Sequence, residues 1–126
     1  MSITIDSTTY NVNVISIVRS GDFLDRYADR TQDGVLQREL IGVYFNFKLK
    51  FAQPDATNIS DYLALWDKLT EAVEFHTVTV PNGSGFETFV AYFANVADEI
   101  EITKASVHYW KNLTANFIAQ SPARTP

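Results

Sequence analysis

The strictest constraint on the fold is an alternation of apolar and polar side chains in the segment IGVYFNFKLKF, from Ile41 to Phe51. The apolar members Val43, Phe45, Phe47, Leu49 and Phe51 share one phase, and Tyr44, Asn46, Lys48 and Lys50 share the other. Because successive side chains of a strand point to opposite faces, the segment predicts a strand with one buried and one solvated face. Such strands are typical of antiparallel sheets.

Similar alternation recurs along the chain. The phase slips between Val14 and Ile15, which predicts a β-bulge or a bend. The segment PNGSG, Pro81 to Gly85, predicts a hairpin turn because Asn and Gly tolerate positive φ. Further strands are expected at residues 3–5, 10–17, 74–80, 86–96 and 112–119, and residues 98–106 are expected to form a short strand or an irregular loop.

A single segment follows the helical period. Apolar residues spaced by three and four, from Ile59 to Val73 through Tyr62, Trp66 and Leu69, predict one helix at about 59–72. Asn58 or Ser60 is the expected N-cap, and Asp61 suits the helix N-terminus. Strands before and after one helix predict an α+β fold, a mostly antiparallel β-sandwich or barrel with one flanking α-helix. We expect one β-rich domain over residues 1–120 and a frayed polar C-terminal tail over 121–126.

Composition excludes several classes of function. The chain of 126 residues has no cysteine, so disulfides, thiolate metal sites and a cysteine nucleophile are excluded. Its net charge of −5 disfavours specific nucleic-acid binding, which depends on Lys and Arg contacts to phosphates. No unbroken apolar run is long enough to span a membrane, and we expect neither a signal peptide nor a membrane partner.

No motif predicts catalysis, a cofactor or a metal, so we expect no enzyme activity. Asp29 to Gly34 resembles the start of a calcium loop, but Leu40 stands where that loop requires a glutamate, so the segment predicts a turn. His76 and His108 are isolated, and a packed or surface histidine is the expected role of His76.

The segment from Arg19 to Leu40 concentrates four of the five arginines and none of the five lysines. It also carries five acidic residues and is nearly neutral. With Phe23, Leu24 and Tyr27 as expected anchors, it is interpreted as a loop that docks on a neighbouring subunit, or as a solvated loop with internal ion pairs. The candidate interface residues, which also include the expected partly exposed Trp110, are Arg19, Arg26, Arg30, Asp33, Arg38, Glu39 and Trp110.

The segment RTQDGVLQRELIGVYFNFKLKF, followed by a turn, YLALWDKL and FHTVTVP, resembles a loose class of prophage-encoded tail proteins. The matching motif positions are Arg30, Thr31, Asp33, Gly34, Leu36, Arg38 and Glu39. The resemblance implies a non-enzymatic structural component of the virion tail, similar to tail-tube and distal-tail proteins. It implies assembly with copies of itself into rings and contact with other tail proteins, after synthesis in the host cytoplasm. The alternative is a small ligand- or carbohydrate-binding β-domain, a decoration or adhesion module.

Overall fold

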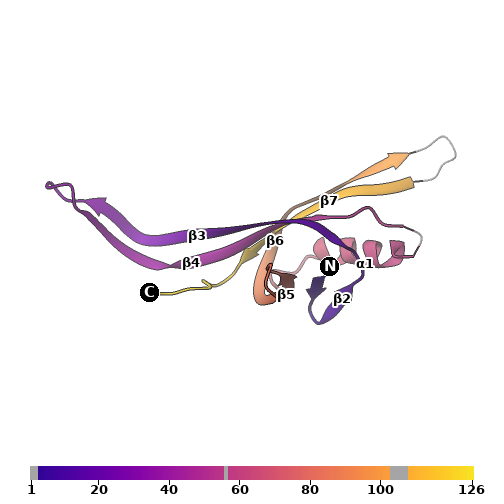
Figure 1. Cartoon of the computed structure of the whole chain (residues 1–126), viewed down its shortest axis with the longest axis horizontal. Helices are drawn as coiled ribbons and strands as arrows, with labels where there is room; N and C mark the ends of the chain where they lie inside the picture. Colours follow the sequence, from indigo (N-terminus) through magenta and orange to yellow (C-terminus); the bar gives the residue numbers. More distant parts are fainter. Residues whose placement is uncertain (1–2, 56, 103–107) are drawn as a thin grey trace.

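The computed structural model describes residues 3–55, 57–102 and 108–126. These residues form seven strands and one helix (Figure 1). In chain order the elements are β1 (Ile3–Ile5), β2 (Thr8–Tyr10), β3 (Val14–Arg30), β4 (Leu36–Phe51), α1 (Ile59–Leu69), β5 (His76–Pro81), β6 (Phe86–Ile102) and β7 (His108–Ala119).

All seven strands belong to one sheet with the order β2-β1-β5-β6-β7-β4-β3. Every neighbouring pair is antiparallel, which confirms the mostly antiparallel α+β fold with a single helix. The sheet is open, with β2 and β3 at its edges. Neither the second sheet of a sandwich nor the closure of a barrel is found among the described residues.

The alternation predicted for β4 is confirmed in the half that crosses the body of the molecule. Phe47, Leu49 and Phe51 are buried, whereas Lys48 and Lys50 are exposed. The contrast weakens between residues 43 and 46, which are all half-buried, because β4 leaves the body there.

The helix α1 is shorter than predicted and ends at Leu69 rather than near residue 72. The hydroxyl of Thr70 donates to the carbonyl oxygen of Trp66 at 2.8 Å, and the Thr70 N–H donates to the same oxygen at 3.0 Å. The buried stripe consists of Tyr62, Leu65 and Leu69. Val73, expected on this stripe, follows the helix and is exposed.

The N-terminus of α1 is tied to the segment that follows β2. Asn58 occupies the N-cap position, but its side chain makes no capping hydrogen bond and donates to the carbonyl oxygen of Asn11 at 3.1 Å. The carboxylate of Asp61 accepts the Asn11 N–H at 2.8 Å. Two polar contacts therefore hold the helix over the sheet.

The hairpin between β5 and β6 has the predicted turn. Gly83 has φ of +94°, and the Asn82 N–H donates to the Gly85 carbonyl at 3.0 Å. β6 continues beyond the expected residue 96 to Ile102, so the first part of the 98–106 segment is strand. The remainder of that segment, residues 103–107, lies outside the described residues, as does the His108 side chain.

An aromatic row crosses the core side of the sheet. Phe117 of β7 is paired with Phe47 of β4 on one side and with Phe93 of β6 on the other. The rings of Phe93 and Phe117 are 4.7 Å apart, and the His76 ring stacks on Phe93 at 4.9 Å. Because these side chains come from four strands, their packing fixes the order of strands at the centre of the sheet.

His76 is packed in the interior, which is one of the two roles predicted for it, a packed or a surface histidine. It is 3% exposed, and its Nδ1 lies 2.6 Å from the carboxylate of Asp6. Asp6 also accepts the Thr77 N–H at 3.0 Å and lies 3.8 Å from the Lys68 ammonium. This acidic partner is remote in sequence, so residue spacing gave no signal of it.

We expect Asp6→Asn to lower the free energy of unfolding by about 1 kcal/mol at neutral pH, the usual contribution of one such hydrogen bond. Asn suits this position because Asp6 has φ of 49°, which Asn tolerates. The hydrogen bond with His76, the Thr77 N–H and the nearby positive charges hold the pKa of Asp6 below its ordinary 3.8. A depressed native pKa stabilises the fold above 3.8, and the gain is lost as pH falls through the native value.

Urea unfolding of both proteins between pH 2 and pH 7 measures this difference. The two stabilities should converge once the pH falls below the depressed native pKa of Asp6, where both side chains are neutral. A difference that stays constant across the series would show that the Asp6 charge contributes nothing.

The C-terminal tail is docked along β4, so the expectation of a frayed end was wrong. The Val43 N–H donates to the Arg124 carbonyl at 2.9 Å, and the Ala123 N–H donates to the Val43 carbonyl at 2.9 Å. The Arg124 guanidinium lies 5.6 Å from the centre of the Phe45 ring. The tail therefore satisfies backbone groups on an edge of β4 that no strand covers at this point.

A candidate interaction arm

The segment expected to be a loop is instead most of a long hairpin. β3 and β4 pair from Val14–Phe51 to Arg30–Leu36, and only residues 31–35 form a turn. β4 pairs with β7 only from Phe47 to Lys50. Residues 19–46, here called the arm, therefore project from the body as a two-stranded ribbon (Figure 1).

The tip of the arm is the turn predicted for Asp33 and Gly34. Gly34 has φ of +84°, and its N–H donates to the Thr31 carbonyl at 2.9 Å. The Asp33 carboxylate accepts the Thr31 hydroxyl and the Val35 N–H, and these donors hold the pKa of Asp33 below its usual range. Asp33 thus closes its own turn. Among the residues that the structure describes, no group of three or more His, Asp or Glu is placed to hold a metal.

Two irregularities bend the arm between its root and its tip. The register shifts between Leu24 and Asp25 and again between Asp25 and Tyr27, where Ile41 and Arg26 are the unpaired residues. Such bulges increase the local twist of a ribbon and interrupt its alternation. A third shift, between Val14 and Ser16, confirms the break of phase predicted near Ile15.

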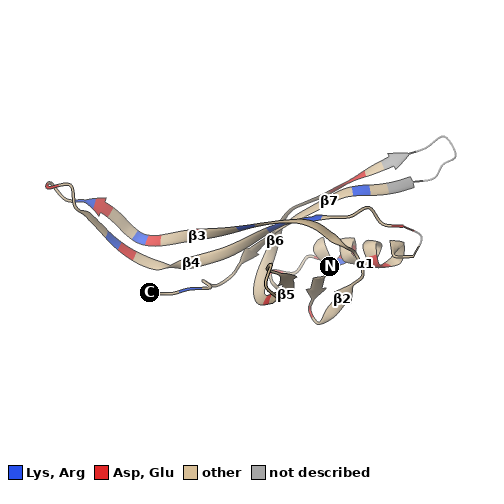
Figure 2. Ribbon diagram, in the orientation of Figure 1, with Lys and Arg blue, Asp and Glu red and all other residues tan. Residues whose placement is uncertain are grey.

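The arginines of the arm all have intramolecular partners. Arg38 contacts the Asp25 carboxylate at 2.6 Å and lies over the Phe23 ring at 5.3 Å. The remaining contacts are Arg26 to Glu39 at 3.7 Å, Arg30 to the Gly34 carbonyl at 3.0 Å and Arg19 to the Asn82 carbonyl at 3.5 Å. Figure 2 shows basic and acidic residues interspersed along the ribbon. The internal ion pairs expected of a solvated segment are therefore present. The role of these residues in contacts with a neighbouring subunit stays a prediction.

Trp110 belongs to β7 and is paired with Ile100 of β6, whereas the four arginines belong to β3 and β4. It is half-buried in β7, and its ring is 6.4 Å from that of Tyr62 in α1. The Tyr62 hydroxyl donates to Asp98 at 2.9 Å, and burial and this carboxylate raise the pKa of Tyr62. Packing between helix and sheet accounts for the position of Trp110, and its interface role remains a prediction.

The apolar side chains expected to anchor the segment are instead exposed. Phe23 is 62% exposed, Leu24 47% and Tyr27 48%. Leu36, 47% exposed, was not singled out as an interface residue from the sequence. The Asp33-Gly34 pair was the sequence feature that could have identified Leu36. Strands that flank such a turn form a hairpin, so side chains from both strands contribute to one surface.

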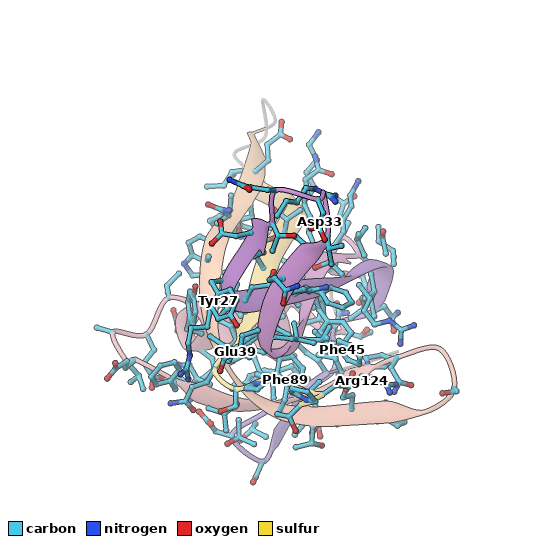
Figure 3. All side chains as sticks on the ribbon, turned by 90° about the vertical axis from the view of Figure 1, so that its left-hand side faces the viewer. Tyr27, Asp33, Glu39, Phe45, Phe89 and Arg124 are labelled. Atoms are coloured by element: carbon cyan, nitrogen blue, oxygen red, sulfur yellow. The ribbon has the colours of Figure 1, made fainter. Side chains whose placement is uncertain are left out.

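The exposed apolar residues lie on both faces of the arm. Phe23 is paired with Val43, two residues from Phe45 and four from the buried Phe47, so it continues the core side of the sheet. Leu24, the next residue, therefore lies on the outer face. Beyond the bulges, Tyr27 is paired with Glu39. Figure 3 shows these two residues on one side of the ribbon and Phe45 and Arg124 on the other, so Tyr27 also lies on the outer face.

A groove of about 390 Å³ lies at the root of the arm, between β3 and the β5–β6 turn. Its lining is largely apolar, including Val14, Ile17, Phe47 and Pro81. The guanidinium of Arg19 at this groove is directed to the Asn82 carbonyl. The groove thus extends the apolar surface of the arm toward the body.

The chain matches no protein-family model and no curated protein. The described part of the chain contains no helix that is long and apolar enough to cross a membrane.

Proposed function

We propose that this chain is a non-enzymatic structural subunit of a phage or prophage tail, located in the virion tail, that assembles with copies of itself into a ring. The resemblance of Arg30–Glu39 to tail proteins supports the class, and the arm supports self-association. Contacts with other tail proteins belong to the same proposal.

The observation that carries the proposal is an exposed two-stranded ribbon with apolar side chains on both faces. An isolated two-stranded hairpin is only marginally stable in water. Large apolar side chains that gather on an exposed surface mark sites of protein contact. A partner that covers the arm both stabilises it and removes its apolar side chains from water.

The surface area of the chain supports the same conclusion. A compact monomer of 14.2 kDa exposes about 6,800 Å². This chain exposes 8024 Å², roughly 1,200 Å² more. Stable interfaces bury about 800 Å² on each partner, so the excess is large enough for one such contact.

Sedimentation velocity and negative-stain electron microscopy, from low to several hundred micromolar protein, test the proposal. The matched variant replaces residues 25–41 by Asn-Gly, which closes the hairpin at the Leu24–Gly42 pair. We expect ring-shaped oligomers of the full chain and a folded monomer of the short-arm variant. A full chain that is monomeric throughout, or flanking genes without tail-assembly functions, would contradict the proposal.

A further inference from the structure

We infer that β3 of one copy of this chain pairs with β3 of a second copy, antiparallel and about a two-fold axis at Gly21. The inference rests on the proposed self-association and specifies one contact within it. The pairing joins the sheets of two subunits edge to edge. Together with a second, different contact, such pairs assemble into a ring of dihedral symmetry.

The free edge of β3 is long and regular. β2, at the other edge of the sheet, has three residues, whereas β3 has 17 and pairs with β4 without a bulge from Ser16 to Leu24. Proteins protect exposed edges with prolines, lysines, bulges or a covering segment. The stretch from Ser16 to Leu24 contains no proline and no lysine, and among the described residues no strand covers it. Its backbone groups are therefore available to another strand.

Gly21 lies within this stretch, and no contact inside the subunit requires a glycine there. Its φ is not positive, and an added Cβ would meet only the Val43 side chain at 3.7 Å, an ordinary contact. A glycine inside a strand lowers the stability of the strand, and it often marks a position that another backbone or an aromatic ring approaches closely. A second strand beside Gly21 provides such an approach.

The charged residues of β3 select the position of the axis. In an antiparallel pair, residues that face each other lie on the same face of the sheet, so a two-fold axis passes through a residue and not between two. An axis at Arg19 or at Asp22 would bring two like charges together, which is unfavourable. An axis at Ser20 would place Val18 opposite Asp22. An axis at Gly21 avoids all three conflicts.

The axis at Gly21 creates three kinds of facing pair, each present twice: Val18 with Leu24, Arg19 with Phe23, and Ser20 with Asp22. The first pair joins apolar side chains that are 59% and 47% exposed in the single subunit. The second places a guanidinium beside the Phe23 ring, which is 62% exposed although Arg38 already lies over it. The third repeats between copies the hydroxyl–carboxylate contact that Ser20 and Asp22 make at 3.1 Å within one copy. This self-complementarity identifies the occupant of the edge as a second copy of the chain.

The rest of the arm adds to the same contact. Because the two strands run in opposite directions, each arm beyond Leu24 follows the root of the other copy's β3, where the groove of about 390 Å³ lies. The short-arm variant lacks residues 25–41 and therefore this part of the contact. Its loss agrees with the monomer expected of that variant.

A residue on a two-fold axis meets its own copy, which gives a test specific to this register. Gly21→Lys and Gly21→Glu should each raise the apparent dissociation constant about tenfold or more, measured by sedimentation velocity, because like charges then face each other. An equimolar mixture of the two variants should restore association to about that of the unmodified chain, because lysine then faces glutamate.

Gly85→Lys and Gly85→Glu are the matched controls. A Cβ at Gly85 would meet nothing within 4 Å, and Gly85 lies in the β5–β6 turn, outside β3. These variants should leave the dissociation constant within about twofold of the unmodified chain. Thermal melting of each variant confirms that it folds.

The absence of cysteine allows a second measurement. Facing residues of antiparallel strands have Cα atoms about 4.5–5.5 Å apart, within the range of a disulfide, so Gly21→Cys should form a covalent dimer under mild oxidation. In Phe23→Cys the two thiols are four positions apart along the paired strands, about 13 Å. We expect its cross-linking to be about tenfold slower or less.

Two results would overturn the inference while self-association stands. These are Gly21→Lys and Gly21→Glu proteins that do not associate when mixed, or that each associate like the unmodified chain, and cross-linking that is equally fast at positions 21 and 23. Either result would show that the copies meet elsewhere and leave the edge of β3 to another protein. A chain that is monomeric at all concentrations would contradict the proposed function itself, and this contact with it.

Discussion

Replacement of Phe117 by alanine should lower the free energy of unfolding by about 3–5 kcal/mol, the usual cost of removing a buried phenylalanine. Phe117 is fully buried in β7. Its ring packs 4.7 Å from Phe93, and its strand pairing places it beside Phe47. The alanine would leave a cavity at the centre of the aromatic row, where strands on both sides restrict collapse.

Ile118→Ala is the matched control because Ile118 is the next residue and points to the outer face, where it is half-buried. We expect a loss of about 1 kcal/mol for its partial burial. Urea unfolding of dilute protein compares the two variants. Equal losses would show that the aromatic row contributes no more than an ordinary half-buried position.

Gly42→Ala should release the C-terminal tail from β4. A Cβ at Gly42 would lie 2.5 Å from the Pro122 side chain and 2.9 Å from the Arg124 carbonyl oxygen, so the tail has to move. Overpacking of this kind costs about 1–3 kcal/mol, comparable to the tail's hydrogen bonds with Val43. We expect faster digestion of the C-terminus by carboxypeptidase and faster hydrogen exchange at the Val43 amide.

Gly21→Ala, in the same hairpin, is the control for the glycine substitution itself. Its Cβ would meet only the Val43 side chain at 3.7 Å, an ordinary contact. The tail should remain protected in this variant. If both variants digest at the same rate, steric contact with the tail is not what requires Gly42.

The sequence was sufficient to predict the fold wherever a regular period was paired with burial. Phe47, Leu49 and Phe51 alternate with lysines and form the buried half of β4, and Gly83 lies in the predicted hairpin turn. The open sheet was not predictable, because alternation reports burial and not which strands remain unpaired. The tail fits against β4 because Gly42 has no side chain. A glycine adds nothing to the alternation of apolar and polar residues, so the sequence did not predict this contact.

The arm was misjudged as a loop for two physical reasons. The bulges near Arg26 and Ile41 shift the alternation, and burial is nearly absent, so the usual contrast between apolar and polar positions disappears. The sequence shows that charged residues are concentrated in this segment, but it did not predict which of them pair within the hairpin. The exposure of Phe23 and Leu24 could be learned only from the position of the ribbon outside the body.

The pairing pattern has a consequence for the order of folding. The arm closes through neighbours such as Arg30 and Leu36, whereas the body requires pairs such as Ile5–Val78 and Lys48–Asn116 that are remote in sequence. Hairpins form in about 1–10 μs, and long-range strand pairs form far more slowly. During synthesis β3 and β4 are complete well before β7 exists. Nascent chains therefore expose the apolar side chains of the arm while the core is still incomplete.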